Sequence, residues 1–265
     1  MTDQAKSGQE RVGRRRFLTR SGAGLALLSL SGCSALSQKQ WVADLLGEVE
    51  KLTRRAQRLF AGSHALAPEF READIAPQFR ANGTLDPGSD DYYAHAATGF
   101  ANWRIPVVGL VERPLTLSLA ALKAFPARTQ ITRHDCVEGW SCIGKWKGTP
   151  LAAVLAAARV KPEARYVVFR CADNMASPGA PTQRYYESLD LLEATHPQTI
   201  LAYELNNNPL PVKHGAPVRL RAERQLGYKM AKFINEIEVV AQLTDIAGGR
   251  GGYREDQGYS WYGGI

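Results

Sequence analysis

The hydrophobic positions of the chain change their period several times, and each change predicts a different element. Residues 42–60 place apolar side chains three and four positions apart with charged residues between them, the pattern of an amphipathic helix. Such a helix either packs as cover or lies on a membrane surface, and Glu48 and Glu50 interrupt the basic face that anionic lipid attracts, which favours packing. Residues 61–104 are rich in Pro, Gly, Asp and Asn, and they predict an ordered but irregular segment wrapped over the main domain.

Shorter β-rich runs follow, separated by turn residues. They cover residues 105–117, 129–132, 165–171, 200–205, 217–221 and 234–240, while residues 151–158 and 189–194 have the composition of short helices. Because strands do not alternate with long helices, we expect an α+β fold with substantial sheet rather than a doubly wound sheet. The tail, residues 248–265, is rich in Gly and aromatic residues and is expected to pack against the domain.

The first 33 residues have the layout of an export signal, with a basic stretch followed by an apolar stretch too short to span a bilayer. Arg14 and Arg15 resemble the twin-arginine signal, which exports folded proteins. The tetrapeptide that ends at Cys33 resembles a lipobox, in which the cysteine is lipidated; an ordinary cleaved signal is the alternative. The expected plan is a twin-arginine signal with lipobox in 1–33, a tether and amphipathic helix in 34–60, and a single domain in 61–265.

The composition is that of a globular protein, with 45% hydrophobic and 22% charged residues in a chain of 265, and it excludes a wholly disordered or collagen-like protein. The net charge of +7 suggests nucleic-acid binding at first sight. Six of the 33 basic and two of the 26 acidic residues lie in the first 32 positions, however, so +4 of this charge belongs to the signal. We therefore expect no nucleic-acid partner, and contact with a membrane only through the lipid anchor.

Besides Cys33, the chain has three cysteines, Cys136, Cys142 and Cys171. A disulfide between Cys136 and Cys142 is one interpretation, but their spacing lacks the CxxC motif of zinc sites and thiol–disulfide exchange proteins. Cys136 follows a strand-like run beside Arg133 and His134, on a loop that contains glycine. A thiolate in this setting suits a soft metal ion whose remaining ligands come from a cofactor, such as dithiolene sulfurs on molybdenum or tungsten.

Two longer blocks carry a resemblance to a known family. The block HDCVEGWSCIGKWKGTPL around Cys136 resembles the signature of the sulfite oxidase family of molybdenum enzymes, and residues 186–234 resemble the pterin-binding half of that family. The resemblance covers residues 79–259 and implies a sulfite-oxidase-type molybdopterin-binding fold with mixed β-sheets and short helices. In layout the chain is similar to the bacterial exported type, which includes catalytic subunits of periplasmic methionine-sulfoxide reductases.

The resemblance also implies site residues. Cys136 would bind the molybdenum, and Tyr259 would be the active-site tyrosine, although its spacing also fits a packed aromatic residue. The cofactor-binding positions implied are Asn82, Cys136, Asp173, His214, Arg219, Met230, Ala231 and Lys232, with Arg219 suited to the pterin phosphate. Arg104 and Arg133 either bind an anionic substrate or pair with carboxylates. Among the remaining candidates, His64, His95 and His196 are expected to be structural or exposed, and Trp140 and Trp146 to pack the core of the loop.

Together these features imply a molybdenum-cofactor oxidoreductase of the cell envelope that transfers an oxygen atom to or from a small substrate, in sulfite-like oxidation or sulfoxide-like reduction. A separate electron carrier, a cytochrome or a quinone-linked membrane protein, would exchange electrons with a monomeric catalytic unit. The expected location is the periplasm or outer cell envelope. The alternative function is a non-catalytic envelope lipoprotein that keeps the fold as a binding module. Cys142, Tyr253 and residues 206–208 depart from the family pattern and leave the substrate open.

Overall fold

The computed structural model describes residues 40–60, 62, 65–177 and 179–265. The predicted export signal and lipobox, the tether up to residue 39 and His64 lie outside the described residues. The chain divides into two units after Thr53, and the unit from Arg54 to Ile265 contains both sheets. The predicted boundary between residues 60 and 61 stays a prediction.

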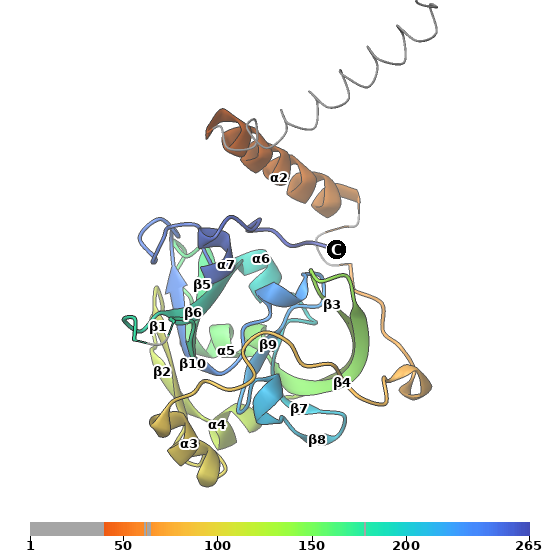
Figure 1. The fold of residues 1–265 in the computed structure, drawn as a ribbon, viewed down its shortest axis with the longest axis vertical. Helices are drawn as coiled ribbons and strands as arrows, with labels where there is room; N and C mark the ends of the chain where they lie inside the picture. The colour runs from red at the N-terminus through yellow and green to blue at the C-terminus, as the bar shows by residue number, and fades with distance from the viewer. Residues whose placement is uncertain (1–39, 61, 63–64, 178) are drawn as a thin grey trace, which may run out of the picture. The chain divides into compact units, whose positions relative to one another are not determined.

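The first sheet has five strands in the order β2-β1-β10-β5-β6 (Figure 1). Its strands are β1 (Arg104–Gly109), β2 (Leu115–Ser118), β5 (Tyr166–Asn174), β6 (Arg184–Asp190) and β10 (Ile234–Val240). β1 and β10 pair in parallel, and every other pair in this sheet is antiparallel. This sheet is therefore mixed, as expected from the sequence.

The second sheet is antiparallel and runs β3-β4-β7-β8, with β9 also paired to β7. Its strands are β3 (Arg128–Asp135), β4 (Ser141–Pro150), β7 (Ile200–Leu205), β8 (Asn208–Pro209) and β9 (Arg219–Arg221). β3 and β4 form a long curved hairpin at the side of the molecule away from the first sheet (Figure 1). The turn of this hairpin carries Cys136.

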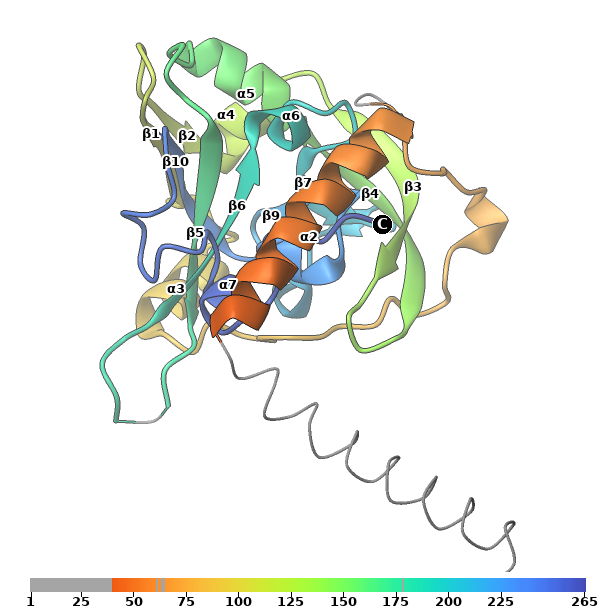
Figure 2. The ribbon, with the colours of Figure 1, turned by 90° about the horizontal axis from the view of Figure 1, so that it is seen from above.

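The main hydrophobic core joins the two sheets. Val107 and Phe169 of the first sheet and Leu201 and Leu220 of the second belong to one buried cluster. The short helices α4 (Leu119–Lys123), α5 (Leu151–Ala158) and α6 (Leu191–Ala194) lie on one side of the unit (Figure 2). Buried side chains alternate along the strands and pack into this core, and the helices between the strands are short. Both features confirm the predicted α+β class.

Most predicted elements form, with informative differences. The run 105–117 is two strands, because Gly109 turns the chain with φ +85° where a Cβ atom would lie 2.2 Å from the Val239 oxygen. β4 and β6 were not predicted as strands. The irregular segment contains the helix α3 (Asp90–Ala97), whose N-cap Ser89 accepts a hydrogen bond from the Tyr92 amide.

The helix α2 (Gln40–Phe60) confirms the predicted amphipathic helix. The remaining helical elements are short. They are α7 (Tyr253–Asp256) and the 3-10 helices η1 (Glu72–Asp74), η2 (Val212–His214) and η3 (Gly227–Lys229). Among the described residues, no helix has the length and apolar character needed to cross a membrane. The tail packs as expected, since the Trp261 indole donates to the Ser188 hydroxyl and the Ile265 amide donates to the Arg224 carbonyl.

Candidate active site

Cys136 lies in the turn at the end of β3, where the sequence placed it. Its backbone amide donates to the Trp140 carbonyl, and its carbonyl accepts from the Gly139 amide, so the turn is closed on both sides of the side chain. Gly139 has φ +83°, which a residue with a Cβ atom rarely adopts. Cys136 is buried, with 7% of its surface exposed.

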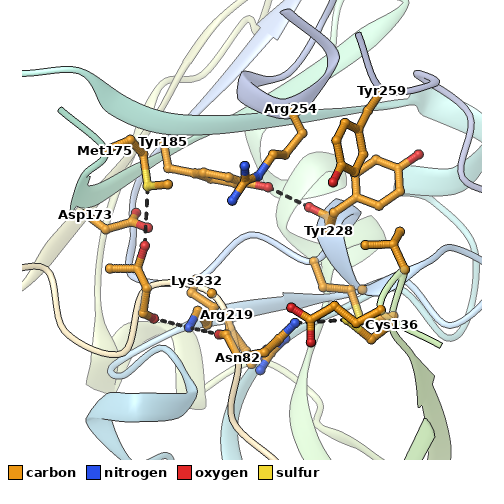
Figure 3. Close-up of a pocket in the computed structure, with 16 residues that line it drawn as sticks. Asn82, Cys136, Asp173, Met175, Tyr185, Arg219, Tyr228, Lys232, Arg254 and Tyr259 are labelled. Carbon is orange, nitrogen blue, oxygen red and sulfur yellow. Dashed lines mark hydrogen bonds between the residues drawn. The ribbon is translucent and has the colours of Figure 1, made fainter. Parts of the chain in front are cut away.

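The Cys136 side chain faces a cavity of about 180 Å³ built from segments far apart in the sequence (Figure 3). The loop before α3, the β3–β4 turn, the ends of β5 and β6, β9, η3 and the C-terminal segment all contribute to its wall. The lining residues are Asn82, Gly83, Thr84, Cys136, Val137, Glu138, Asp173, Met175, Tyr185, Arg219, Gly227, Tyr228, Met230, Lys232, Arg254 and Tyr259.

Asn82 connects the loop before α3 to the cysteine. Its side-chain amide donates a hydrogen bond to the Cys136 sulfur over 3.1 Å. The Lys232 ammonium in turn donates to the carbonyl of Asn82 over 2.9 Å and also to the carbonyl of Thr84. One lysine therefore fixes the loop whose Asn82 side chain holds the cysteine sulfur.

Arg219 is a buried cation with few partners. Its Nη1 atom donates to the His214 carbonyl over 3.1 Å and its guanidinium lies 5.0 Å from the centre of the Trp146 ring, but its buried Nε atom has no hydrogen-bond partner. Burial, together with the nearby Arg221, lowers the pKa of Arg219 to about 9. Burial and the charge of Arg219 lower the pKa of Lys232 to about 7. Within the described residues, neither cation forms a salt bridge.

Asp173 adds a hydrogen-bonding group to the same wall. Its side chain is buried, burial raises its pKa, and its Oδ1 atom has no hydrogen-bond partner. The buried Arg219 and the partly buried Lys232, which form no salt bridge among the described residues, and a carboxyl oxygen without a donor are together the complement of a ligand that carries both a phosphate and N–H groups. The residues present therefore fit a molybdopterin, with Cys136 as the sulfur ligand.

Arg221 is two residues from Arg219 on β9 but has a different environment. It forms a buried ion pair with Glu223, with Nη2 2.5 Å from one carboxylate oxygen and Nε 2.9 Å from the other. Its Nη1 atom donates to Nδ1 of His134 over 2.9 Å. Burial and Arg221 together hold the pKa of His134 well below its usual range. His134 is therefore neutral, with its proton on Nε2.

The neutral His134 supports the segment that carries η3. Its Nδ1 atom lies 3.3 Å from the Met230 sulfur, and Arg221 contacts the same sulfur. A Cβ atom on Gly227 would lie 2.4 Å from the His134 Nε2 atom, so only glycine allows this close approach. The β3 strand thus fixes both the cysteine turn and, through His134, the neighbouring cavity residues Gly227 and Met230.

The second side of the cavity comes from aromatic and cationic residues of β6, η3 and the C-terminal segment. Figure 3 shows Tyr185, Arg254, Tyr228 and Tyr259 along this side and Cys136, Asn82 and Arg219 along the other. The Tyr185 hydroxyl donates to the Tyr228 carbonyl, and the rings of Tyr228 and Tyr259 meet edge to face at 5.3 Å. These contacts fix the side of the cavity that faces the cysteine.

A buried ion triad fastens the C-terminal segment to the sheet. The Lys229 ammonium lies between the carboxylates of Glu187 on β6 and Glu255 on α7, and it pairs with both. All three side chains are almost fully buried. Since Glu255 follows Arg254 directly, this triad determines where Arg254 enters the cavity wall.

Most of the residues singled out from the sequence meet at this cavity, namely Asn82, Cys136, Asp173, Arg219, Met230, Lys232 and Tyr259. His214 and Ala231 are not in its wall. His214 is buried against Phe79, and its carbonyl, rather than its ring, contacts Arg219. Ala231 belongs to the hydrophobic core. Their direct roles in cofactor binding stay predictions.

The other sequence candidates also have clear environments. Cys136, Cys142 and Cys171 are all free, so the interpretation of a disulfide between Cys136 and Cys142 is wrong. Arg133 pairs with Asp135 at 2.9 Å and Arg104 donates to backbone carbonyls, and both lie outside the cavity wall. Their contacts within the unit confirm the structural roles expected of His95, Trp140, Trp146 and His196.

Sequence reasoning missed Arg254, Tyr228 and Glu138 as cavity residues. Glu138 is two positions after Cys136, and this proximity alone was a usable signal. Arg254 and Tyr228 had no such signal, because only the folded chain brings the tail and η3 beside the cysteine turn.

Comparison with known proteins gives consistent similarities. The family profile described as oxidoreductase molybdopterin binding domain matches residues 94–245. The chain is 37% identical over 251 residues to a protein of Azospira oryzae with the provisional name protein-methionine-sulfoxide reductase subunit YedZ1, which covers 95% of this chain and 87% of that protein. It is 40% identical over 151 residues to the protein-methionine-sulfoxide reductase catalytic subunit MsrP of Xanthomonas campestris, covering 55% of this chain and 47% of MsrP.

The fold is similar to that of the sulfane dehydrogenase SoxCD from Paracoccus pantotrophus, with a TM-score of 0.51 and 23% sequence identity over 68% of this chain and 46% of that chain. The matched part therefore spans about half the length of the MsrP and SoxCD chains. This similarity agrees with the fold predicted from the two sequence blocks.

Proposed function

The chain belongs to the family of molybdopterin-binding oxidoreductases that includes the sulfite oxidases, and from this premise we propose that it reduces methionine sulfoxide in proteins. Membership makes it a molybdopterin-dependent oxidoreductase with molybdopterin as its cofactor. The direction of the reaction is supported by the relatives named as methionine-sulfoxide reductases. In this reaction the sulfoxide takes up two electrons and two protons, and it yields the thioether and water.

The observation that carries the proposal is the pair of basic residues in the cavity wall beside Cys136, the buried Arg219 and the partly buried Lys232, which form no salt bridge among the described residues. These two cations would hold the pterin phosphate, Asp173 would accept from a pterin N–H group, and the Cys136 sulfur would bind the metal. Bound molybdenum supplies a two-electron redox centre for oxygen-atom transfer. Asn82 restrains the direction of the sulfur through its hydrogen bond.

The second side of the cavity would bind the substrate. Tyr259 offers a phenolic O–H group and Arg254 a guanidinium group to the sulfoxide oxygen, and both can stabilise the negative charge that grows there. The Tyr185–Tyr228 hydrogen bond keeps this side in position. The separate electron donor, a cytochrome or quinone-linked membrane protein, is part of the proposal, and the word subunit in the names of the relatives supports it.

Metal content tests the cofactor site. Wild-type protein from a host that makes the cofactor should contain molybdenum by mass spectrometry and should reduce protein-bound methionine sulfoxide with a reduced dye as electron donor. Cys136→Ala should lose the metal, whereas Cys142→Ala, which removes a buried thiol outside the cavity wall, should keep it. Wild-type protein without molybdenum, or full metal retention in Cys136→Ala, would contradict the proposal. If the protein oxidised sulfite and did not reduce sulfoxide, the proposed direction of the reaction would be wrong.

Export by the twin-arginine route and lipid attachment at Cys33 complete the proposed function, and the signal-like sequence of residues 1–33 supports both. Replacing Arg14 and Arg15 by Lys should leave the precursor in the cytoplasm. Cys33→Ala should abolish the incorporation of labelled palmitate. Normal export of the first variant, or labelling of the second, would reject the corresponding step.

A further inference from the structure

Five charged side chains line the cavity, and the proposed cofactor accounts for three of them. Arg219 and Lys232 would hold the pterin phosphate, and Asp173 would accept from a pterin N–H group. The other two are the carboxylate of Glu138 and the guanidinium of Arg254. Neither of these forms a salt bridge with any of the described residues, although both face the same cavity.

Glu138 is held in the turn that carries Cys136. The Cys136 carbonyl accepts from the Gly139 amide, so Glu138 lies inside a tight turn. The Trp140 indole donates to the Glu138 carboxylate over 2.8 Å, and the Arg80 guanidinium lies 4.7 Å from the centre of the Trp140 ring. The carboxylate is therefore restrained by a neutral donor, which leaves its negative charge in place.

Arg254 reaches the cavity from the other side. It belongs to α7, and Figure 3 shows it across the cavity from Cys136. Its Nη1 atom donates to the side-chain oxygen of Gln257 over 3.3 Å, so its restraint is again a neutral group. A negative and a positive group on two sides of one cavity, both without a salt bridge among the described residues, are the complement of a dipole rather than of an ion.

A sulfoxide is such a dipole. Its S–O bond has a partial positive charge on sulfur and a partial negative charge on oxygen, and the group as a whole is neutral. Arg254 can donate to the oxygen while Glu138 attracts the sulfur end. The thioether product has no S–O bond, so it loses both interactions. An oxyanion such as sulfite is also attracted by Arg254, but Glu138 repels its net charge.

We propose that Glu138 and Arg254 together select a neutral, dipolar S–O group, and that Glu138 excludes small oxyanions. This inference rests on the proposed function, because it assigns the specificity of the same cavity. Without Glu138, the substrate side of the cavity would carry a positive charge that an oxyanion could neutralise.

Ligand binding to the oxidised holoenzyme, which has no electrons with which to reduce a sulfoxide, tests the proposal by isothermal titration calorimetry. The probes are N-acetyl-methionine-sulfoxide methylamide as the neutral dipole, the corresponding thioether, and sulfate as the oxyanion. Glu138→Gln should weaken sulfoxide binding by about threefold, tighten sulfate binding by about fivefold and leave thioether binding unchanged, because an exposed carboxylate is partly screened and a dianion feels its charge twice. Arg254→Gln should weaken the binding of sulfoxide and of sulfate alike.

Two control variants accompany these. Glu163→Gln removes the same charge from an exposed side chain outside the cavity wall, and it should change each dissociation constant by less than about 1.5-fold. Glu138→Asp keeps the charge and should keep the weak sulfate binding of the wild type. The tightening of sulfate binding in Glu138→Gln should shrink between about 0.02 M and about 0.3 M salt, because salt screens a charge but not a change in packing.

Opposite shifts for sulfoxide and sulfate in Glu138→Gln support the proposal. Shifts in the same direction, shifts as small as those of Glu163→Gln, or no sulfoxide binding by the wild type overturn it. Thermal unfolding shows whether each variant is folded. Molybdenum content and turnover on the same samples report on the proposed function separately, since a wild type that contains molybdenum and binds sulfoxide but does not reduce it would reject that function alone.

Discussion

The two neighbouring arginines of β9 should respond oppositely to the same substitution. Arg219→Met removes a buried cation that has no carboxylate partner, and Arg221→Met removes one that is paired with Glu223. In protein made without cofactor, we expect Arg219→Met to be more stable than the wild type and Arg221→Met to be less stable. The comparison is matched, since both side chains are buried, lie on the same strand and contact the same Trp146 ring.

The magnitude for Arg219 follows from its environment. The fall in the pKa of Arg219 from its ordinary value to about 9 corresponds to roughly 5 kcal/mol against the charged form, as an upper bound. The variant loses the hydrogen bond to the His214 carbonyl, worth about 1.5–3 kcal/mol, and the contact with Trp146, worth about 1 kcal/mol. The net gain is therefore at most about 1–2.5 kcal/mol. For Arg221→Met the uncompensated Glu223 carboxylate costs about 3–5 kcal/mol.

Urea unfolding followed by circular dichroism measures both effects, on protein from a host that cannot make molybdopterin. The urea midpoint should rise for Arg219→Met and fall for Arg221→Met. In protein from a competent host, Arg219→Met should instead retain less molybdenum than the wild type. A midpoint for cofactor-free Arg219→Met that is equal to or below that of the wild type would refute the reasoning that this cation awaits an anion.

Three further predictions concern the surroundings of the cavity. Lys229→Met leaves Glu187 and Glu255 without their cation and should cost about 3–5 kcal/mol in urea unfolding, more than Glu187→Gln, which keeps one ion pair; a loss below about 1 kcal/mol would reject the triad as a fastening. Burial lowers the pKa of His134 far below 6.5 and that of His214 to about 4, so below pH 6.5 the unfolded chain binds protons that the native state does not. Stability should therefore fall as the pH drops from 6.5 toward 4, by up to about 1.4 kcal/mol per pH unit for each histidine, and His214→Gln should show a smaller fall between urea midpoints measured at pH 7 and pH 5. Gly227→Ala should lower the thermal midpoint and the molybdenum content together, because its Cβ atom would displace His134; unchanged values for both would show that the close approach is not required.

Two strands could be predicted closely. β7 and β10 have the predicted bounds, because strand-forming apolar side chains recur along both segments and can be recognised without knowledge of their neighbours. β4 could not, since Gly144 and Gly148 interrupt its pattern. A Cβ atom on Gly148 would lie 2.4 Å from the Leu201 oxygen and one on Gly144 would meet the Phe79 ring, so both glycines are needed by contacts with distant residues. The weak local strand preference there reflects a tertiary requirement.

The candidate site likewise contains residues that could be predicted from the sequence and residues that could not. Cys136 and Arg219 could be predicted because each lies in a block whose residue types and order are specific. The Lys229 triad could not, since Glu187 and Glu255 appear as ordinary polar residues, and only the fold buries them around one ammonium group. The cavity position of Arg254 depends on that triad, so it was hidden for the same reason.

The pairing of charges at β9 indicates an anion site that the residue types alone did not reveal. Arg219, Arg221 and Glu223 alternate along the chain, so one carboxylate follows two arginines of the same strand. The carboxylate pairs with the nearer arginine, and burial then leaves the farther one with a charge that only a ligand can neutralise. An arginine left over after local pairing is accordingly a stronger indicator of an anion site than a basic residue counted by itself. The same criterion also selects Lys232, whose ammonium donates to backbone carbonyls and forms no salt bridge within the described part of the chain.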